Sequence, residues 1–168
     1  FVDVEAGTGN IDPILVADTV RALSSNGSGR NNLLPRKMPG EPGDLKAILP
    51  VDVFGQPADL DSLSSIAEDY DLKIIEDSCE ALGAEYKGRK SGTLGNYGVF
   101  AFYPNKQMTT GEGGIIVTNN ERTASLCRSM RNQGRGEGDE WLQHSVLGYN
   151  YRISDINCAL GIAQLERI

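Results

Sequence analysis

The sequence predicts an α/β fold with a mostly parallel sheet that carries helices on both faces. Short, nearly continuous apolar runs such as 46–51 and 72–76 alternate along the chain with stretches of helical period. Continuous apolar runs are typical of parallel strands, which are buried on both faces, and their alternation with helices is typical of parallel sheets. A chain of 168 residues is long enough for one domain with its own core.

The chain opens on a strand-like segment, Phe1–Val4, and then begins a helix. Asp12 can accept hydrogen bonds from the free amides at the helix start, and Pro13 suits the first helical position. The apolar period carries this helix through Leu23. Residues 24–44 are rich in Ser, Gly, Asn and Pro, and so long a loop is either mobile or functional.

Two predicted strands bracket the second helix. The first strand covers 46–51 and is followed by a turn at 55–58. Asp59 then caps a helix whose apolar positions are Leu60, Leu63, Ile66 and Ala67. The second strand covers 72–76 and ends at Asp77.

The rest of the chain is predicted to contain two more strands and two more helices. In chain order these are a strand at 98–103, a strand at 115–118, a helix from Asn119 or Asn120 to about Asn132, and a helix that starts at Ser154. The glycine-punctuated segment 78–97 and the polar segment 133–147 are expected to be connections.

Composition argues against several classes of protein. Net charge is −7, with 16 Lys and Arg against 23 Asp and Glu, so neither nucleic acid nor an anionic membrane is an expected partner. The densest basic group, Arg128, Arg131 and Arg135, is interpreted as the solvated end of a helix. Three widely spaced cysteines and a single histidine predict no metal site, reduced thiols and a cytoplasmic protein. No apolar stretch has the length of a membrane span, and no signal peptide is visible.

Both ends of the chain look cut. It begins without Met on a strand-like segment, and it closes on the helical pattern 159–168 with no glycine or other stop signal. We therefore expect a piece of a longer polypeptide.

Lys106 and Asp77 are the residues that indicate chemistry. Lys106 lies in a turn between two predicted strands, and Asp77 follows another strand. A lysine in a tight, partly apolar turn can form a Schiff base with an aldehyde. Pyridoxal phosphate needs such a lysine together with a carboxylate for its pyridinium nitrogen. Because ligands of parallel sheets gather beyond the carboxyl ends of the strands, we expect both side chains to line one cleft.

Four motifs occur in a familiar order and spacing. They are Gly55–Asp59, Ile75–Ala84, Phe102–Lys106 with Thr109–Gly114, and Gly148–Asp155. Together they resemble the DegT/DnrJ/EryC1/StrS family of pyridoxal-phosphate sugar aminotransferases, which have the fold-type-I aminotransferase fold. The resemblance implies that residues 1–168 are part of the cofactor-binding large domain, without an N-terminal segment and a C-terminal small domain.

The resemblance also implies roles for individual residues. Lys106 matches the lysine that holds the cofactor and moves the proton, and Asp77 matches the aspartate paired with the pyridine nitrogen. Glu80 falls where the family has Gln, His or Glu near the phenolic oxygen; the lesser alternative is a solvated loop carboxylate. Asn150 matches an asparagine that contacts the cofactor phosphate bound in the partner subunit, which implies a homodimer. The family often has a phosphate-binding serine where this chain has Ala101.

The reaction implied by the resemblance moves an amino group from a donor such as glutamate to a keto sugar linked to a nucleotide. Related dehydrating enzymes carry histidine at the lysine position, so Lys106 favours transamination. The alternative is a truncated, non-catalytic folding or dimerisation module of the same family. Gly111–Gly114 is interpreted as either a simple turn or a ligand contact. His144 and Cys79 are expected to be structural rather than catalytic.

Overall fold

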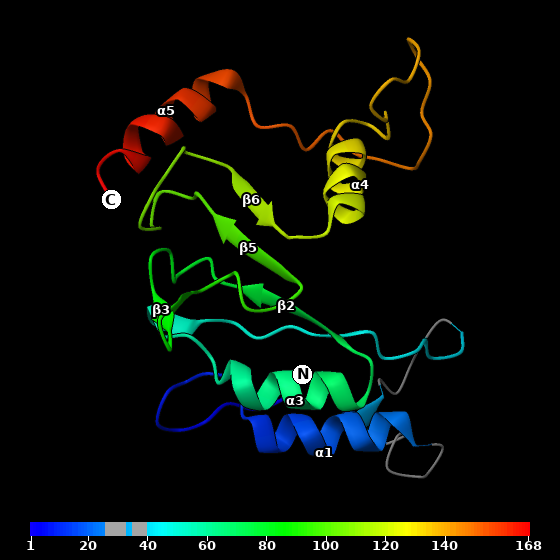
Figure 1. The fold of residues 1–168 in the computed structure, drawn as a ribbon, viewed down its shortest axis with the longest axis vertical. Helices are drawn as coiled ribbons and strands as arrows, with labels where there is room; N and C mark the ends of the chain where they lie inside the picture. Colours follow the sequence, from blue (N-terminus) through cyan, green and yellow to red (C-terminus); the bar gives the residue numbers. More distant parts are fainter. Residues whose placement is uncertain (26–32, 35–39) are drawn as a thin grey trace.

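A four-stranded sheet in the order β1–β2–β5–β6 forms the centre of the computed structural model, which describes residues 1–25, 33–34 and 40–168 (Figure 1). The strands are β1 (Ala47–Ile48), β2 (Lys73–Asp77), β5 (Tyr97–Ala101) and β6 (Gly114–Val117). β1, β2 and β5 are parallel to one another, and β6 is antiparallel to β5. The predicted α/β class with a mostly parallel sheet is confirmed.

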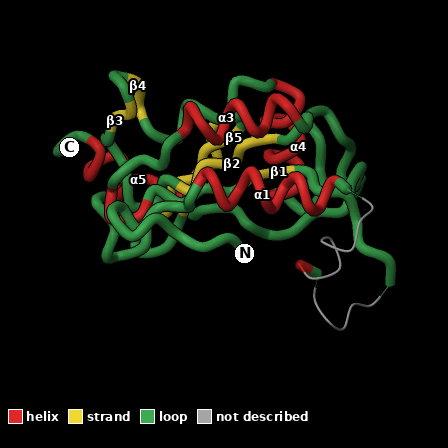
Figure 2. The backbone as a smooth tube through the Cα atoms, turned by 90° about the horizontal axis from the view of Figure 1, so that it is seen from below, coloured by secondary structure: helices red, strands yellow, loops and turns green. Residues whose placement is uncertain are grey.

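Helices flank the sheet at both ends. They are α1 (Pro13–Ser24), α3 (Leu60–Asp69), α4 (Glu121–Arg131) and α5 (Asp155–Leu165), with a short 3-10 turn, η1 (Val53–Gly55). α1 and α3 lie side by side near β1 and β2, whereas α4 and α5 lie near the β6 end (Figures 1 and 2). Within the described ranges, no helix is both long and apolar enough to cross a membrane.

The four predicted helix starts are correct. Asp12 accepts a hydrogen bond from the Ile14 amide at 2.8 Å, and the same kind of side-chain cap is made by Asp59, Asn120 and Ser154. Each cap satisfies an amide that has no partner inside its helix, which is why short polar residues mark these boundaries in the sequence.

The apolar core lies between the first two helices and the first two strands. Its buried members come from α1, β1, α3 and β2 and from the segments beside them: Val16, Val20, Ile48, Ala58, Leu60, Leu63, Ala67, Leu72 and Ile74. The predicted apolar positions of the second helix therefore face this core.

Two predicted strands are wrong in extent. Phe1–Val4 is not a strand, and only Val4 forms an isolated bridge, to Ile11, because the partner segment enters α1 at Pro13. The strand predicted over 46–51 is reduced to β1, since Pro50 has no amide to donate to a ladder. Most of the predicted loop 24–44 lies outside the described residues.

The connection 78–97 contains a hairpin that the sequence analysis missed. β3 (Glu85–Tyr86) and β4 (Arg89–Lys90) are antiparallel. The two residues between them, Lys87 and Gly88, have φ angles of 51° and 78°. Positive φ at both central positions is typical of the tight turn that matches the twist of paired strands.

The last part of this connection is anchored by a buried carboxylate. Glu76 is fully buried, and its oxygens accept hydrogen bonds from the amides of Gly92 at 2.8 Å and Leu94 at 2.7 Å. Gly98 of β5 lies so close that a Cβ atom there would overlap the Gly92 carbonyl oxygen. The loop is thus fixed against the strand that leads to Lys106.

Candidate active site

The carboxyl ends of β2 and β5 bring the two predicted chemical groups to one edge of the sheet. Asp77 is the last residue of β2 and pairs in register with Val99 of β5. Lys106 lies in the turn after β5, where its amide donates to the Tyr103 carbonyl oxygen at 3.0 Å. Parallel strands place ligands at this edge, so the position of both residues suits a binding site.

Glu80 connects Lys106 to the neighbouring loop. The Lys106 Nζ lies 3.2 Å from Glu80 Oε1, and the lysine side chain is 17% exposed against 39% for the glutamate. Glu80 Oε2 accepts a hydrogen bond from the Phe54 amide at 3.0 Å. The Phe54 amide, followed by the hydrogen bond and charge of Lys106, lowers the pKa of Glu80. Glu80 is thus a direct partner of the lysine and not merely a solvated carboxylate.

Asp77 and Lys106 both contact the short segment that follows β2, through the Cys79 amide and the Glu80 carboxylate. Asp77 Oδ1 accepts a hydrogen bond from the Cys79 amide at 3.2 Å. Burial raises the pKa of the Cys79 thiol to about 12, helped by the hydrogen bond and charge of Asp77, while the charge of Lys106 acts in the opposite direction. A thiol with so high a pKa is protonated at neutral pH and is no nucleophile.

Three buried polar residues hold the loop beside the site. Asp52 Oδ2 accepts from Ser78 Oγ at 2.6 Å. Asn10 holds the loop from the other side, since its Oδ1 accepts from the Val53 amide at 3.0 Å. Phe54, at the tip, has a φ of 54° and is 89% exposed. Sequence analysis missed these supports, because a polar residue beside an apolar run also fits an exposed turn.

Asn150 lies apart from the other predicted site residues. It forms an isolated bridge with Asn132, just beyond the end of α4, and is exposed. Within the described part of the chain it makes no hydrogen bond to Lys106, Asp77 or Glu80. Its contact with a cofactor phosphate, which the resemblance assigns to the partner subunit, stays a prediction.

The residues present supply the two groups that the ring of pyridoxal phosphate requires, an amine for its aldehyde and a carboxylate for its nitrogen. Lys106 supplies an amine, and the Asp77 carboxylate forms no ion pair with any described residue, so it is free to meet a protonated ring nitrogen. The phosphate end has fewer groups. Ala101 has no hydroxyl, and the Thr109 and Thr110 hydroxyls donate to backbone carbonyl oxygens.

Two weaker candidates are assigned to local structure. Gly111 has a φ of 82°, and its amide donates to Thr109 Oγ1 at 2.9 Å, which favours the simple turn over a ligand contact. His144 Nδ1 lies 2.7 Å from the Gln133 carbonyl oxygen and serves to close the 133–147 segment.

A mostly parallel sheet with a lysine and a carboxylate at one carboxyl edge is an arrangement that suits an α/β protein binding pyridoxal phosphate. The sequence model of the DegT/DnrJ/EryC1/StrS aminotransferase family matches residues 1–168. The chain belongs to this family.

Individual relatives agree with this assignment. The chain is 45% identical to a GDP-perosamine synthase of Caulobacter vibrioides over 93% of its own length and 40% of that protein. It is 41% identical to a UDP-4-amino-4,6-dideoxy-N-acetyl-beta-L-altrosamine transaminase of Campylobacter jejuni, over 74% of its length and 34% of that protein. A family aminotransferase from Brucella abortus superimposes with a TM-score of 0.85 at 29% identity, over 99% of this chain and 40% of that structure. The chain thus spans 34% to 40% of the length of these relatives.

Proposed function

We propose that the complete protein is a pyridoxal-phosphate-dependent aminotransferase. It moves an amino group from a donor such as glutamate to the keto group of a nucleotide-linked sugar. The observation that carries this proposal is that Asp77 ends β2 and Lys106 lies in the turn after β5, with Glu80 of the segment after β2 at 3.2 Å from the lysine amine. The names of the relatives, a GDP-perosamine synthase and a UDP-sugar transaminase, support the class of acceptor.

Each site residue has a separate task in this proposal. Lys106 would bind the aldehyde carbon of the cofactor and would move the proton between the donor carbon and the cofactor carbon. Asp77 keeps the ring nitrogen protonated, and the cofactor in that state supplies the electron sink that the reaction requires. Glu80 holds the Lys106 amine by an ion pair of 3.2 Å, and in the proposed complex it lies near the phenolic oxygen.

Domain organisation and assembly form part of the same proposal. Residues 1–168 are proposed to be part of the cofactor-binding large domain of a longer cytoplasmic protein. Asn150 is proposed to contact the cofactor phosphate of the partner in a homodimer. The support is its position outside the edge that carries Lys106 and its exposure at the end of α4.

A trapping experiment tests the role of Lys106. The protein, extended to the length of its relatives, is incubated with pyridoxal phosphate, reduced with borohydride and digested, and the modified peptide is identified by mass spectrometry. We expect the modification on Lys106 and its loss in Lys106→Ala. Lys87→Ala is the matched control, because Lys87 is an exposed lysine paired with Asp61. Modification that persists in Lys106→Ala would overturn the assignment.

The same experiment on residues 1–168 alone addresses the alternative. Labelling of the longer protein without labelling of the 168-residue chain would indicate that this stretch is a folding or dimerisation module on its own. Acceptor specificity is then measured on the longer protein, with glutamate as donor and a panel of GDP- and UDP-linked keto sugars. No amino transfer to any of them would contradict the proposed substrate class.

A further inference from the structure

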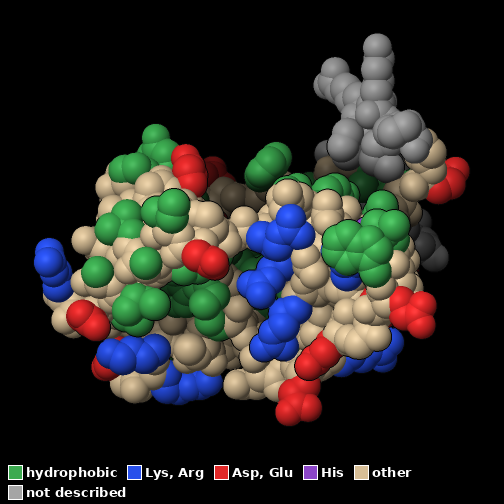
Figure 3. All heavy atoms as spheres, turned by 90° about the horizontal axis from the view of Figure 1, so that it is seen from above, with side chains coloured by type: hydrophobic (Ala, Val, Ile, Leu, Met, Phe, Trp, Pro, Cys, Tyr) green, Lys and Arg blue, Asp and Glu red, His purple; other side chains and the backbone are tan. Residues whose placement is uncertain are grey.

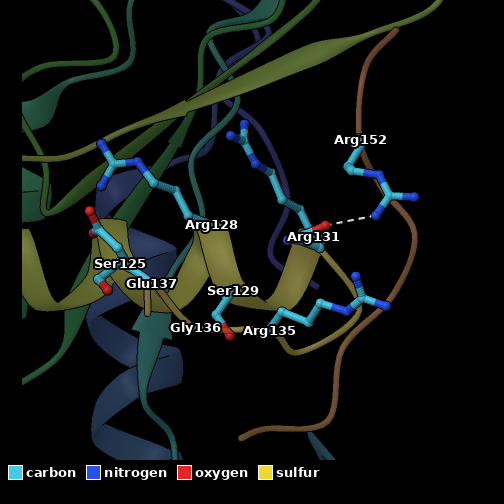
Figure 4. A pocket seen from close by; sticks show the side chains of 9 residues that line it. Ser125, Arg128, Ser129, Arg131, Arg135, Gly136, Glu137 and Arg152 are labelled. Atoms are coloured by element: carbon cyan, nitrogen blue, oxygen red, sulfur yellow. Dashed lines mark hydrogen bonds between the residues drawn. The ribbon is translucent and has the colours of Figure 1, made fainter. Parts of the chain in front are cut away.

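A basic pocket lies beside the C-terminal end of α4, and Lys106 is not among its lining residues (Figure 4). Its volume is about 570 Å³, and four arginines line it together with one acidic residue, Glu137: Arg128, Arg131, Arg135 and Arg152. The pocket joins two segments far apart in sequence, since Arg152 follows the Asn150 bridge to Asn132. Figure 3 shows basic side chains in a row on the face of the molecule that is seen from above.

The charge balance of this pocket is unusual for the chain. The protein carries a net charge of −7, yet none of the four arginines forms an ion pair with a described Asp or Glu. Guanidinium groups that line one pocket repel one another, and an anion bound in the pocket offsets this repulsion. Four arginines without an ion pair to a described acidic residue, around one pocket of an acidic protein, therefore indicate a place for an anionic ligand.

The helix dipole accounts for two of the four arginines. Arg128 and Arg131 lie in the last turn of α4, where a positive charge stabilises the helix end. Arg135 and Arg152 lie outside the helix, so this explanation does not cover them. The ordinary interpretation as a solvated helix end is incomplete.

Arg135 and Arg152 are held in place by the protein. The Arg135 guanidinium lies over the Trp141 ring, 5.1 Å from its centre, and the buried Arg135 Nε has no hydrogen-bond partner among the described residues. Arg152 Nη1 donates to Asn132 Oδ1 at 2.7 Å. Figure 4 shows the two guanidinium groups on the same side of the end of α4. Fixed guanidinium groups lose little freedom when they bind, which favours a planar, multidentate anion partner.

We propose that this pocket binds the phosphate or diphosphate group of a ligand, with Arg135 and Arg152 as the main donors. Phosphate oxygens accept the paired N–H groups of a guanidinium, and these charge-assisted bonds are among the strongest in proteins. Arg128 and Arg131 add positive charge around the group. The site is distinct from the edge of the sheet that carries Lys106 and Asp77.

Calorimetric titration of the protein with inorganic pyrophosphate, in the absence of pyridoxal phosphate, tests the site. We expect saturable binding that weakens as salt is added. Arg135→Gln and Arg152→Gln should each lower the affinity about tenfold, as expected for the loss of one charge-assisted bond. Arg122→Gln is the matched control, because Arg122 is an exposed arginine of α4 outside the pocket.

Two results would overturn the proposal. One is the absence of saturable pyrophosphate binding, and the other is an equal loss of affinity in Arg122→Gln, which would indicate a general charge effect. Circular dichroism of each variant separates lost binding from lost folding. Because no cofactor is present, these outcomes do not depend on the proposed aminotransferase activity.

A kinetic arm identifies the source of the phosphate. In the longer protein, a raised KM for the nucleotide sugar with unchanged kcat in Arg135→Gln would assign the pocket to the diphosphate of the substrate. An unchanged KM, together with weakened pyrophosphate binding, would assign it to a separate phosphorylated ligand. This arm alone rests on the proposed function.

Discussion

The part of the chain that ends with β5 and the part that begins with β6 differ in how they bury apolar side chains. The first part encloses a continuous core between α1, α3, β1 and β2. In the second part, Ile115 and Ile116 of β6 are 47% and 52% exposed, although neighbouring strand residues point to opposite faces. Neither face of β6 is covered by the described residues, and α5 likewise exposes Ile156 and Ile162.

An apolar sequence pattern therefore has a different structural basis in the two parts of the chain. In the first part the pattern identifies residues that pack against one another within the stretch itself. In the second part an equally apolar pattern marks surfaces whose cover is not found among the described residues. Since the chain spans about 40% of its relatives, the relatives have additional polypeptide that this stretch does not contain. Stability tests should therefore give opposite results in the two parts.

The largest contrast is expected between a core leucine and an exposed isoleucine. Leu63 is fully buried and Ile156 is 82% exposed. Leu63→Ala should lower the free energy of unfolding by about 2–5 kcal/mol because it leaves a cavity, whereas Ile156→Ala should change it by less than about 0.5 kcal/mol. Urea denaturation of residues 1–168 measures both. A cost for Ile156→Ala as large as that for Leu63→Ala would break the comparison.

The buried Glu76 and the exposed Glu121 provide the same comparison for polar side chains. Glu76→Gln should cost about 1–3 kcal/mol, because the new amide group faces backbone N–H donors in a buried site. Glu121→Gln is its matched control, since Glu121 is exposed at the start of α4 in the second part. Both variants are compared by thermal denaturation. Equal melting temperatures would show that the loop 92–95 does not depend on the buried carboxylate.

The cap of α3 should contribute less and should depend on pH. The hydrogen bond from Ser62, followed by that from Tyr86, lowers the pKa of Asp59 below its ordinary value of 3.8. A carboxyl with a lower pKa in the folded state stabilises the fold above 3.8 and loses that contribution as pH falls through its folded value. Asp59→Ala should therefore cost about 0.5–2 kcal/mol at neutral pH.

The test of this cap is a pair of denaturation series at neutral pH and at pH below the ordinary aspartate value. The difference in the free energy of unfolding between Asp59→Ala and the unsubstituted protein should become smaller in acid. Asp18→Ala, which removes an exposed partner of Arg21 on α1, should show little cost at either pH. A gap that stays constant across the series contradicts the assigned role of the charge.

The smallest expected effect is a change in the reactivity of the Cys79 thiol. This test concerns the candidate active site, where it compares the influence of Asp77 with that of Lys106. Asp77→Asn should lower the pKa of Cys79 and speed its alkylation at mildly alkaline pH, because a hydrogen-bonded negative neighbour is lost. Lys106→Met should slow it, because a nearby positive charge is lost. Alkylation of Cys79 is followed by peptide mass spectrometry, with Cys158 on α5 as the internal reference. Identical alkylation rates of Cys79 in the two variants would contradict the inference that Asp77 and Lys106 line one site.

Local rules predicted a large share of this structure. Helix starts follow from a single capping residue, so Asp12, Asp59, Asn120 and Ser154 could be identified from sequence alone. The shared edge of Asp77 and Lys106 follows from parallel strands, which end on the same side. These features depend on contacts between residues close in sequence or on the topology of the sheet.

Features made by distant partners could not be predicted in the same way. The arginine pocket needs Arg152 beside Arg135, and nothing in the sequence shows that the Asn132–Asn150 bridge brings them together. Glu76 looked like an ordinary strand residue, because its amide partners lie in a loop with no regular pattern. Phe1–Val4 has the composition of a strand but lacks a neighbour long enough to pair with it.

The contact between Gly98 and Gly92 has a consequence for how this protein can vary. β5 leads directly into the turn that carries Lys106. The position of the Lys106 amine therefore depends on the lack of a Cβ atom at Gly98. Any side chain there has to displace the 92–95 loop or tilt the strand. Selection for chemistry is therefore expected to act on a residue that never meets a ligand.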